Sequence, residues 1–194
     1  MNRVTAVDFE RMYAAAPDPW GLEWSDYETR KYAATLDELG RRRYPRATEI
    51  GCALGVFTAM LAPRCGHLLA MDFSPAAVAM TRRRVADRAN VEVVLASFPE
   101  QAPAGPWDLV ICSEVLYYLD RAALGEALAW FADQLAGGAT VVTAHWRGPG
   151  VTEPLSGDEV HDQMSRELGR WHARDARRPG YRLDRFDGSW DRRG

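Results

Sequence analysis

The chain has 194 residues, of which 47% are hydrophobic and 26% charged, a composition typical of a globular protein with one substantial core. Its 24 basic and 27 acidic residues give a formal net charge of −3, which provides no overall attraction for nucleic acid or anionic membranes. We therefore expect a single domain over residues 1–194, with neither a nucleic-acid nor a membrane partner.

The N-terminal sequence "MNRVTAVDFERMY" has no apolar signal-peptide core and no transit-peptide pattern, and no segment approaches the roughly 18 apolar residues of a membrane span. A cytoplasmic location is expected. The three cysteines, Cys52, Cys65 and Cys112, form no C-x-x-C pair and are odd in number. This pattern argues against a zinc site and a disulfide framework, so we expect buried thiols and no metal.

The first 40 residues divide into two parts. Residues 1–24 hold aromatic side chains among turn-forming Pro and Gly, and are predicted to form a lid or connector without regular structure. Ser25 and Glu28 then have the spacing of a capping box, and apolar residues recur at helical spacing until Gly40. We expect a helix from about residue 26 to 39.

Short apolar strands then alternate with helices. Strands are expected at 47–51, 68–72, 91–96, 108–113 and 139–146, and helices at 56–64, 74–88 and 121–138. A second capping-box spacing at Ser156 and Glu159 predicts a helix to about 168, and a hairpin is expected from 171–176 and 181–186. The pattern predicts an α/β, Rossmann-like fold: a seven-stranded, mostly parallel sheet with a C-terminal antiparallel hairpin and helices on both faces.

The loop after the first expected strand reads G-C-A-L-G and is the first candidate for a ligand site. Glycine at 51 and 55 lets the backbone turn sharply and approach a ligand closely. Asp72, at the end of the second strand, can accept hydrogen bonds from both ribose hydroxyls. An NAD site shares these features, but the loop lacks the G-x-G-x-x-G pattern, and Glu49 suits a cationic group better than a diphosphate. S-adenosylmethionine (SAM) is therefore favoured over NAD.

The combination of E-x-G-x-x-x-G, an aspartate ending the second strand and "WDLVICSEVLYYL" resembles the class I SAM-dependent methyltransferases over about residues 45–145. The upstream "DPW" and "YETRKYAATL", with the later "EVLYYL", are similar to the nodulation protein S subgroup. Members of that subgroup N-methylate a deacetylated glucosamine unit of a lipochitooligosaccharide. The resemblance implies SAM as the methyl donor and S-adenosylhomocysteine (SAH) as the product.

The resemblance also implies which residues contact the cofactor. They are Trp20, Lys31, Glu49, Gly51, Gly55, Asp72, Ser97, Phe98 and Ser113. Glu49 would line the methionine end and Asp72 would hold the ribose. Trp20 and Lys31 match the N-terminal cofactor cover of the subgroup, so residues 1–40 are expected to form a lid and helix over the site. Lys31, the only lysine of the chain, is the candidate partner of the SAM carboxylate.

Candidates for acceptor chemistry also come at expected strand ends. His145 follows the fifth strand, and histidine titrates close to neutral pH, so it is the first candidate for a general base; Glu114 and His161 are the others. Tyr117 and Tyr118 are candidates for a substrate wall that stacks on or hydrogen-bonds to a sugar. The sequence shows no dedicated cluster of metal ligands, which favours an amine acceptor over a hydroxyl.

Three functional hypotheses remain. Nucleobase methyltransferases of similar fold carry an N/D-P-P-Y/F tetrad after the fourth strand, where this chain reads S-E-V-L. The first hypothesis is an N-methyltransferase whose small-molecule acceptor is an amino sugar or glycosylated metabolite. The second is an O- or N-methyltransferase of another small natural product, and the third is a SAM-binding pseudoenzyme.

Overall fold

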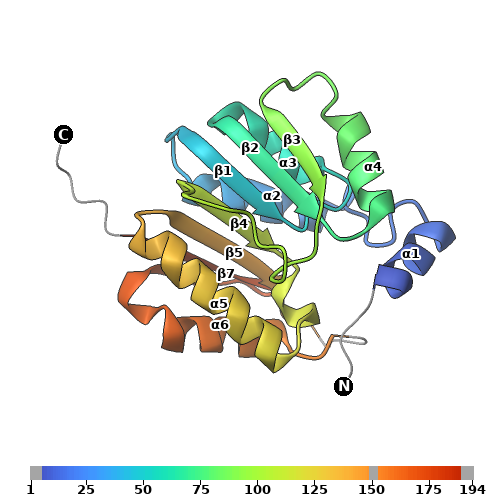
Figure 1. The fold of residues 1–194 in the computed structure, drawn as a ribbon. Helices are drawn as coiled ribbons and strands as arrows, with labels where there is room; N and C mark the ends of the chain where they lie inside the picture. The colour runs from blue at the N-terminus through green and yellow to red at the C-terminus, as the bar shows by residue number, and fades with distance from the viewer. Residues whose placement is uncertain (1–5, 149–152, 189–194) are drawn as a thin grey trace.

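The computed structural model describes residues 6–148 and 153–188 and contains one seven-stranded sheet (Figure 1). The strands follow the spatial order β3-β2-β1-β4-β5-β7-β6. Their bounds are β1 Tyr44–Ile50, β2 Cys65–Asp72, β3 Val91–Leu95, β4 Leu109–Ser113, β5 Thr140–Trp146, β6 His172–Arg177 and β7 Tyr181–Asp187. The helices are α1 Ala6–Ala15, α2 Asp26–Glu38, α3 Val56–Leu61, α4 Pro75–Arg84, α5 Arg121–Ala136 and α6 Gly157–Glu167, with short 3-10 turns η1 Ala62–Arg64, η2 Leu116–Tyr118 and η3 Gly169–Trp171.

The five strands β1 to β5 are parallel, and β7 runs antiparallel between β5 and β6. Strand order reverses beside β1, which pairs with β2 on one side and β4 on the other. In an open parallel sheet, this reversal separates the loops at the carboxyl ends of the strands and creates a ligand crevice. The predicted fold, including the C-terminal antiparallel hairpin, is confirmed.

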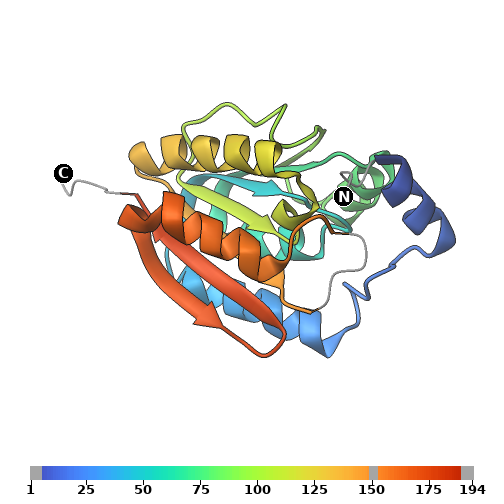
Figure 2. The same cartoon turned by 90° about the horizontal axis from the view of Figure 1, so that it is seen from below.

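Helices cover both faces of the sheet (Figures 1 and 2). On one face, α5 and α6 pack against a cluster that includes Val141, Met164 and Phe186. On the other, α2 and α3 cover a cluster that includes Val142 and Ala144. Neighbouring residues of β5 thus face opposite layers, as the two-residue period of a strand requires.

Local start signals explain where several helices begin. The Ser74 hydroxyl accepts a hydrogen bond from Ala77 N–H (3.2 Å) at the start of α4. At α6, Ser156 and Glu159 form the full reciprocal capping box that the sequence predicts. The thiols of Cys52, Cys65 and Cys112 are free and buried, as predicted.

Two predictions about the N-terminal segment are wrong. Residues 6–15, predicted to lack regular structure, form the helix α1, because Phe9 and Tyr13 give this segment an apolar side that packs against the body of the protein. The Ser25 side chain makes no capping hydrogen bond, although α2 begins where predicted. Glu28, the expected second half of that capping box, is buried and paired with Lys31 instead.

Two features are absent from the part of the chain that the structure describes. No helix within residues 6–148 and 153–188 is long and apolar enough to cross a membrane. The same residues contain no group of three or more His, Cys, Asp and Glu side chains arranged to hold a metal ion.

Candidate active site

A cavity of about 850 Å³ lies at the carboxyl ends of the parallel strands. Its walls come from the segments that follow β1, β2, β3 and β4, from the last residue of β5, and from α1 and α2. Eleven of the residues predicted from the sequence line it: Trp20, Lys31, Glu49, Gly51, Asp72, Ser97, Phe98, Ser113, Glu114, Tyr117 and Tyr118. Its volume is in the range of pockets that enclose a small ligand.

The turn after β1 is tied to the next strand and leaves no room for a side chain. Gly51 and Cys52 both donate their backbone N–H groups to the carbonyl of Met71, at 2.9 and 3.0 Å. Gly51 has a φ of +80°, and a Cβ atom there would lie 2.3 Å from the Val115 Cγ2 atom. Glycine is therefore required at this position for both its left-handed backbone and its close packing.

Gly55 has a different place from the one predicted. It precedes α3 with a φ of +72°, and a Cβ atom there would meet Thr81 at 2.8 Å. Gly55 is not among the residues that line the cavity. Its backbone lets the loop turn into α3 against α4, so we do not retain it as a ligand-contacting residue.

Asp72 is fixed at the end of β2 by two backbone donors. Its Oδ1 accepts from Ser74 N–H and its Oδ2 from Ala53 N–H, each at 3.0 Å. Burial raises the pKa of Asp72, and these N–H groups partly oppose that rise. Each carboxylate oxygen keeps acceptor capacity, so Asp72 presents two oriented acceptors to the cavity.

Glu49 is a buried acid in the wall of the cavity. It is the penultimate residue of β1, and only 4% of it is exposed. The Oε2 atom has no hydrogen-bond partner among the described residues. Burial raises the pKa of Glu49 to about 8. Such a group gains most from a cationic ligand, which supplies the missing partner and favours the carboxylate form.

The wall after β3 and β4 is partly apolar. Phe98 stacks on Phe131 with a centroid distance of 5.8 Å and also belongs to the main core cluster, so only part of its surface faces the cavity. Ser97 lies beside it, and Ser113 ends β4.

An aromatic cluster lines one side of the cavity. Trp20 lies 5.6 Å from Phe9 and 5.4 Å from Tyr13, measured between ring centroids, and Phe9 lies 5.1 Å from Tyr118. These residues all line the cavity, and α1 supplies two of them. The cluster joins the N-terminal segment to the loop after β4.

The other side of the cavity contains a buried cation between two carboxylates. Lys31 Nζ lies 2.9 Å from Glu28 Oε1 and also forms a close ion pair with Glu114 Oε1. Burial opposes the charged form of the amine, but the two carboxylates outweigh it and raise the pKa of Lys31. Lys31 therefore lines the cavity as part of a Glu28–Lys31–Glu114 cluster, rather than as a separate cation available to a ligand carboxylate.

Glu114 follows β4 in an unusual backbone conformation. Its φ is +57°, which is strained for a residue other than glycine and is often found at functional sites. The Glu114 Oε2 atom accepts hydrogen bonds from the Tyr117 hydroxyl (2.6 Å) and from Trp146 N–H (2.9 Å). With Lys31 on the other oxygen, the carboxylate is oriented from both sides and its side chain remains 23% exposed.

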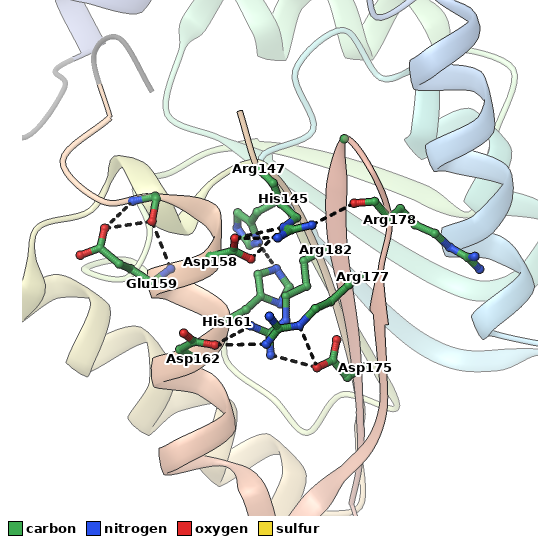
Figure 3. Close-up of polar contacts among 12 residues, drawn as sticks. His145, Arg147, Asp158, Glu159, His161, Asp162, Asp175, Arg177, Arg178 and Arg182 are labelled. Atoms are coloured by element: carbon green, nitrogen blue, oxygen red, sulfur yellow. Dashed lines mark hydrogen bonds and ion pairs between the residues drawn. The ribbon is translucent and has the colours of Figure 1, made fainter. Parts of the chain in front are cut away.

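His145 and His161 lie outside the cavity, contrary to their predicted roles as bases. Both are completely buried, and neither lines the cavity. Because β5 side chains alternate, His145 points toward α6 while Trp146 points toward the cavity side. Figure 3 shows the contact between the two rings, and His145 Nδ1 lies 3.0 Å from His161 Nε2. His145 Nε2 accepts from Leu116 N–H at 3.2 Å. Both ring nitrogens of His145 are thus occupied by contacts inside the protein and cannot reach a methyl acceptor in the cavity. We do not retain either histidine as the base.

Sequence reasoning missed several residues of the cavity. Tyr27, Glu28, Tyr32 and Thr35 line it from α2, and Trp146 lines it from the end of β5. Trp146 could have been predicted, because side chains alternate along a strand and those of His145 and Trp146 must point to opposite faces of the sheet. Glu28 stands three residues before the only lysine of the chain, a spacing that allows a helical ion pair.

Comparison with known sequences identifies related proteins. The family model described as nodulation protein S (NodS) matches residues 5–147. Nodulation protein S of Sinorhizobium fredii (strain NBRC 101917 / NGR234) is 36% identical over 110 residues, which are 56% of this chain and 51% of that protein. The Rhizobium tropici protein of the same name is 36% identical over 124 residues, which are 61% of this chain and 52% of its own length. The chain thus matches about half the length of these relatives.

Solved structures share the fold. A structure described as a putative methyltransferase from Pseudomonas syringae is 36% identical, with a TM-score of 0.72 over 83% of this chain and 98% of its own. The N-methyltransferase NodS from Bradyrhizobium japonicum WM9, solved with SAH, has a TM-score of 0.80 over 96% of this chain and 100% of its own. At 22% identity, that second match supports the fold only.

Proposed function

This chain belongs to the nodulation protein S family, and from that membership we propose that it is a SAM-dependent methyltransferase acting on a small-molecule amine. The acceptor we favour is the amine of an amino sugar or a glycosylated metabolite. Three features of the cavity support this proposal: its fit to the methyl donor, its excess of carboxylates, and its aromatic wall.

The residues of the cavity suit SAM at two points. Glu49 has a buried, unpartnered carboxylate oxygen, which fits the ammonium group of the methionine moiety. Asp72 offers two fixed acceptors for the ribose hydroxyls, and Gly51 lines the cavity without a side chain that would keep a ligand away from the backbone. When bound, SAM supplies an electrophilic methyl group on a sulfonium. The aromatic cluster of Phe9, Tyr13 and Trp20 would then exclude water from the bound donor.

The single observation that carries the choice of an amine is the charge of the Glu28–Lys31–Glu114 cluster. Two carboxylates face one ammonium, so the ionised cluster has one uncompensated negative charge in a largely buried place. A protonated amine would complete this balance, whereas a neutral hydroxyl would leave it unchanged. Because charge pairing strengthens as water is excluded, the cluster favours a cationic acceptor.

Glu114 is the residue we assign to the acceptor proton. Its carboxylate is oriented by Lys31, Tyr117 and the Trp146 backbone, and it is the most exposed acid of the cluster. It binds the amine and takes up the proton that the nitrogen loses on becoming a nucleophile. Alignment of the amine is the larger contribution, because near-attack positioning is worth about 7–11 kcal/mol, whereas a general base typically gives about 10²- to 10⁴-fold.

The remaining wall suits a sugar. Tyr117, Tyr118 and Trp146 line the cavity around Glu114 and present aromatic faces and hydroxyl groups. Trp146 is 37% exposed, so its ring lies at the entrance to the cavity, where the apolar face of a sugar ring can pack on it.

The test begins with isothermal titration of the purified chain with SAH and, separately, with NADH. Binding of SAH alone, at micromolar affinity, is expected. Methyl transfer from SAM is then followed by mass spectrometry with three matched acceptors: glucosamine oligomers, the same oligomers fully N-acetylated, and glucose oligomers. We expect product with the first only. Product with the glucose oligomers instead would favour O-methylation, and SAH binding with no product from a wide acceptor panel would support a pseudoenzyme.

A matched variant tests the role of Glu114. Glu114→Gln keeps the size of the side chain and can still accept from Tyr117, but it cannot take up a proton. We expect unchanged SAH affinity and a loss of at least about 100-fold in turnover. Normal turnover by this variant would rule out Glu114 as the proton acceptor.

A further inference from the structure

The strained turn that carries Glu114 is held by the end of β5. Three consecutive residues of that strand bind it: the Ala144 carbonyl accepts from Glu114 N–H (2.9 Å), His145 Nε2 accepts from Leu116 N–H (3.2 Å), and Trp146 N–H donates to the Glu114 carboxylate (2.9 Å). A non-glycine residue at φ +57° costs roughly 1–3 kcal/mol and persists only where its surroundings impose it. These three contacts impose it.

The His145 contact requires one particular tautomer. An imidazole nitrogen that accepts from Leu116 N–H carries no proton, so in neutral His145 the proton lies on Nδ1. That Nδ1–H donates to His161 Nε2 (3.0 Å), which in turn leaves the His161 proton on Nδ1. His161 Nδ1–H then donates to Asp184 Oδ2 at 2.8 Å. Each bond in the chain fixes the direction of the next.

The far end of this series of hydrogen bonds is a buried carboxylate beside a guanidinium. Asp184 is completely buried on β7, and Arg182 Nε lies 3.5 Å from its Oδ2. Burial alone would raise the pKa of Asp184, but the His161 hydrogen bond and the charge of Arg182 outweigh it and lower that pKa. Arg182 is itself held by Asp162 at 2.6 Å and Asp175 at 3.2 Å (Figure 3). The Asp184 carboxylate, which accepts the last hydrogen bond, is therefore ionised and held in place.

We propose that His145, His161 and Asp184 form a positioning relay: it fixes His145 in the tautomer that holds Leu116 N–H, and so fixes the turn from Glu114 to Tyr117 at the acceptor side of the cavity. The proposal rests on the proposed function in one respect, that Glu114 meets the acceptor amine. None of the three residues touches the cavity. They are positioning residues and exchange no proton with a substrate.

The surroundings of His145 keep its ring neutral. Burial lowers its pKa, and His161 on α6 and Lys31 on α2 lower it further. The Tyr117 ring of η2 packs edge-on against it, with centroids 5.3 Å apart. A protonated ring would lose the Leu116 bond, because both nitrogens would then be donors. The environment thus protects the one state in which the turn is held.

Three variants separate positioning from catalysis by a base. His145→Leu removes both hydrogen bonds. His145→Gln places an amide oxygen near the position of Nε2, so it can accept from Leu116 N–H, but it cannot serve as a base. His161→Phe keeps an aromatic ring and removes the acceptor that fixes the His145 tautomer. His67→Leu, at a side chain that is 43% exposed on β2, is the matched control for a histidine substitution.

The measurements do not all depend on turnover. Amide hydrogen exchange at Leu116 reports its hydrogen bond, nitrogen-15 NMR reports the histidine tautomers, and SAH titration reports the donor site. Turnover of the amine acceptor, split into kcat and KM, reports the effect on the reaction. The first two readouts decide whether the relay exists even where no acceptor is turned over, so failure of the proposed function is distinguished from failure of the relay.

We expect both imidazoles of the wild-type protein to carry their proton on Nδ1. In His145→Leu, Leu116 exchange should accelerate about tenfold, as for the loss of one hydrogen bond, and kcat should fall about 100-fold, as for a misplaced reacting group. SAH affinity should stay within about twofold. His145→Gln should recover most of both losses, and His161→Phe should give mixed tautomers of His145 with an intermediate kcat.

Several results would overturn the proposal. A proton on Nε2 of His145 in the wild-type protein contradicts the direction of the relay. Unchanged Leu116 exchange in His145→Leu means that the bond does not hold the turn. Equal inactivity of His145→Gln and His145→Leu, with SAH bound normally by both, would return His145 to the role of base. Loss of SAH binding in every relay variant, but not in His67→Leu, would mean that the network only supports the fold.

Discussion

Replacement of Lys31 by methionine tests the buried ion cluster most directly. Lys31→Met keeps most of the side-chain volume and removes the charge, leaving Glu28 and Glu114 in one buried place with no cation between them. Removal of one partner from a buried ion pair typically costs about 3–5 kcal/mol, because the remaining charge is uncompensated. Glu114 is partly exposed and can be screened by water, so the penalty falls mainly on Glu28 and we expect the lower limit, about 3 kcal/mol. In a chain of this length, that corresponds to a decrease in Tm of roughly 6–12 °C.

The pH dependence has a defined sign. Burial raises the pKa of Glu28, and the charge and hydrogen bond of Lys31 partly oppose that rise. In Lys31→Met this opposition is gone, so the Glu28 pKa rises further and protonation removes the burial penalty more readily. A group with a raised folded-state pKa gains stability as the pH falls through that pKa. The difference between variant and wild type should therefore shrink from about pH 7 to about pH 5.

The assay is urea unfolding of four proteins: wild type, Lys31→Met, Glu28→Gln and the double variant. The double variant should recover most of the lost stability near pH 7, because it leaves neither an unpaired cation nor an unpaired Glu28 carboxylate. A Lys31→Met variant within about 1 kcal/mol of wild type near neutral pH, or a penalty that grows on acidification, would refute the description of this cluster as a buried charge network.

Two further predictions concern the donor site. Gly51→Ala should destabilise the protein by about 1–3 kcal/mol, because its Cβ would meet Val115, and should weaken SAH binding at least tenfold by isothermal titration. The control is Gly40→Ala, also at positive φ but in open space, which should leave SAH affinity unchanged. Equal effects of the two variants on SAH affinity would exclude the steric explanation. SAH affinity should rise between about pH 7 and pH 8 and then level off, because Glu49, with its pKa of about 8, must release a proton to pair with an ammonium. The released proton is taken up by the buffer, so the binding heat measured by isothermal titration should also depend on which buffer is used. Glu49→Gln should abolish both the pH dependence and the buffer dependence, and a pH dependence that survives in the variant would assign the proton to another group.

The sequence predicts the fold well because its signals are local and repeated. Alternating strands and helices, the Ser74 and Ser156 caps and the glycines after α5 each act within a few residues, and the structure contains the elements that they predict. The donor side of the cavity is likewise predictable, since Gly51 and Asp72 directly follow or end parallel strands whose carboxyl ends must meet.

The acceptor side is less predictable because its residues choose between partners that are distant in sequence. Strand β5 ends with His145 and Trp146, whose rings both carry N–H groups. Which of the two is buried depends on which face of the sheet α6 covers. His145 points to α6 and Trp146 to the cavity, so titration behaviour alone gave the wrong member of the pair as a functional candidate. The partner that binds His145 lies on a helix 16 residues away, and no local pattern indicates that contact.

Glu28 shows the same competition in α2. Its spacing from Ser25 favours a capping box, and an N-cap hydrogen bond of this kind is worth only about 1 kcal/mol. The pair with Lys31 instead gives the buried Glu28 carboxylate a cation at 2.9 Å, and leaving that buried carboxylate unpaired would cost several times more. The ion pair therefore prevails over the cap, and the helix begins without its side-chain hydrogen bond. Departures from a local rule are expected where tertiary or functional demands are strongest. Glu28 gives up its cap and Glu114 adopts a left-handed backbone, and both carboxylates bind the same ammonium, so tertiary contacts override two local rules within this one cluster.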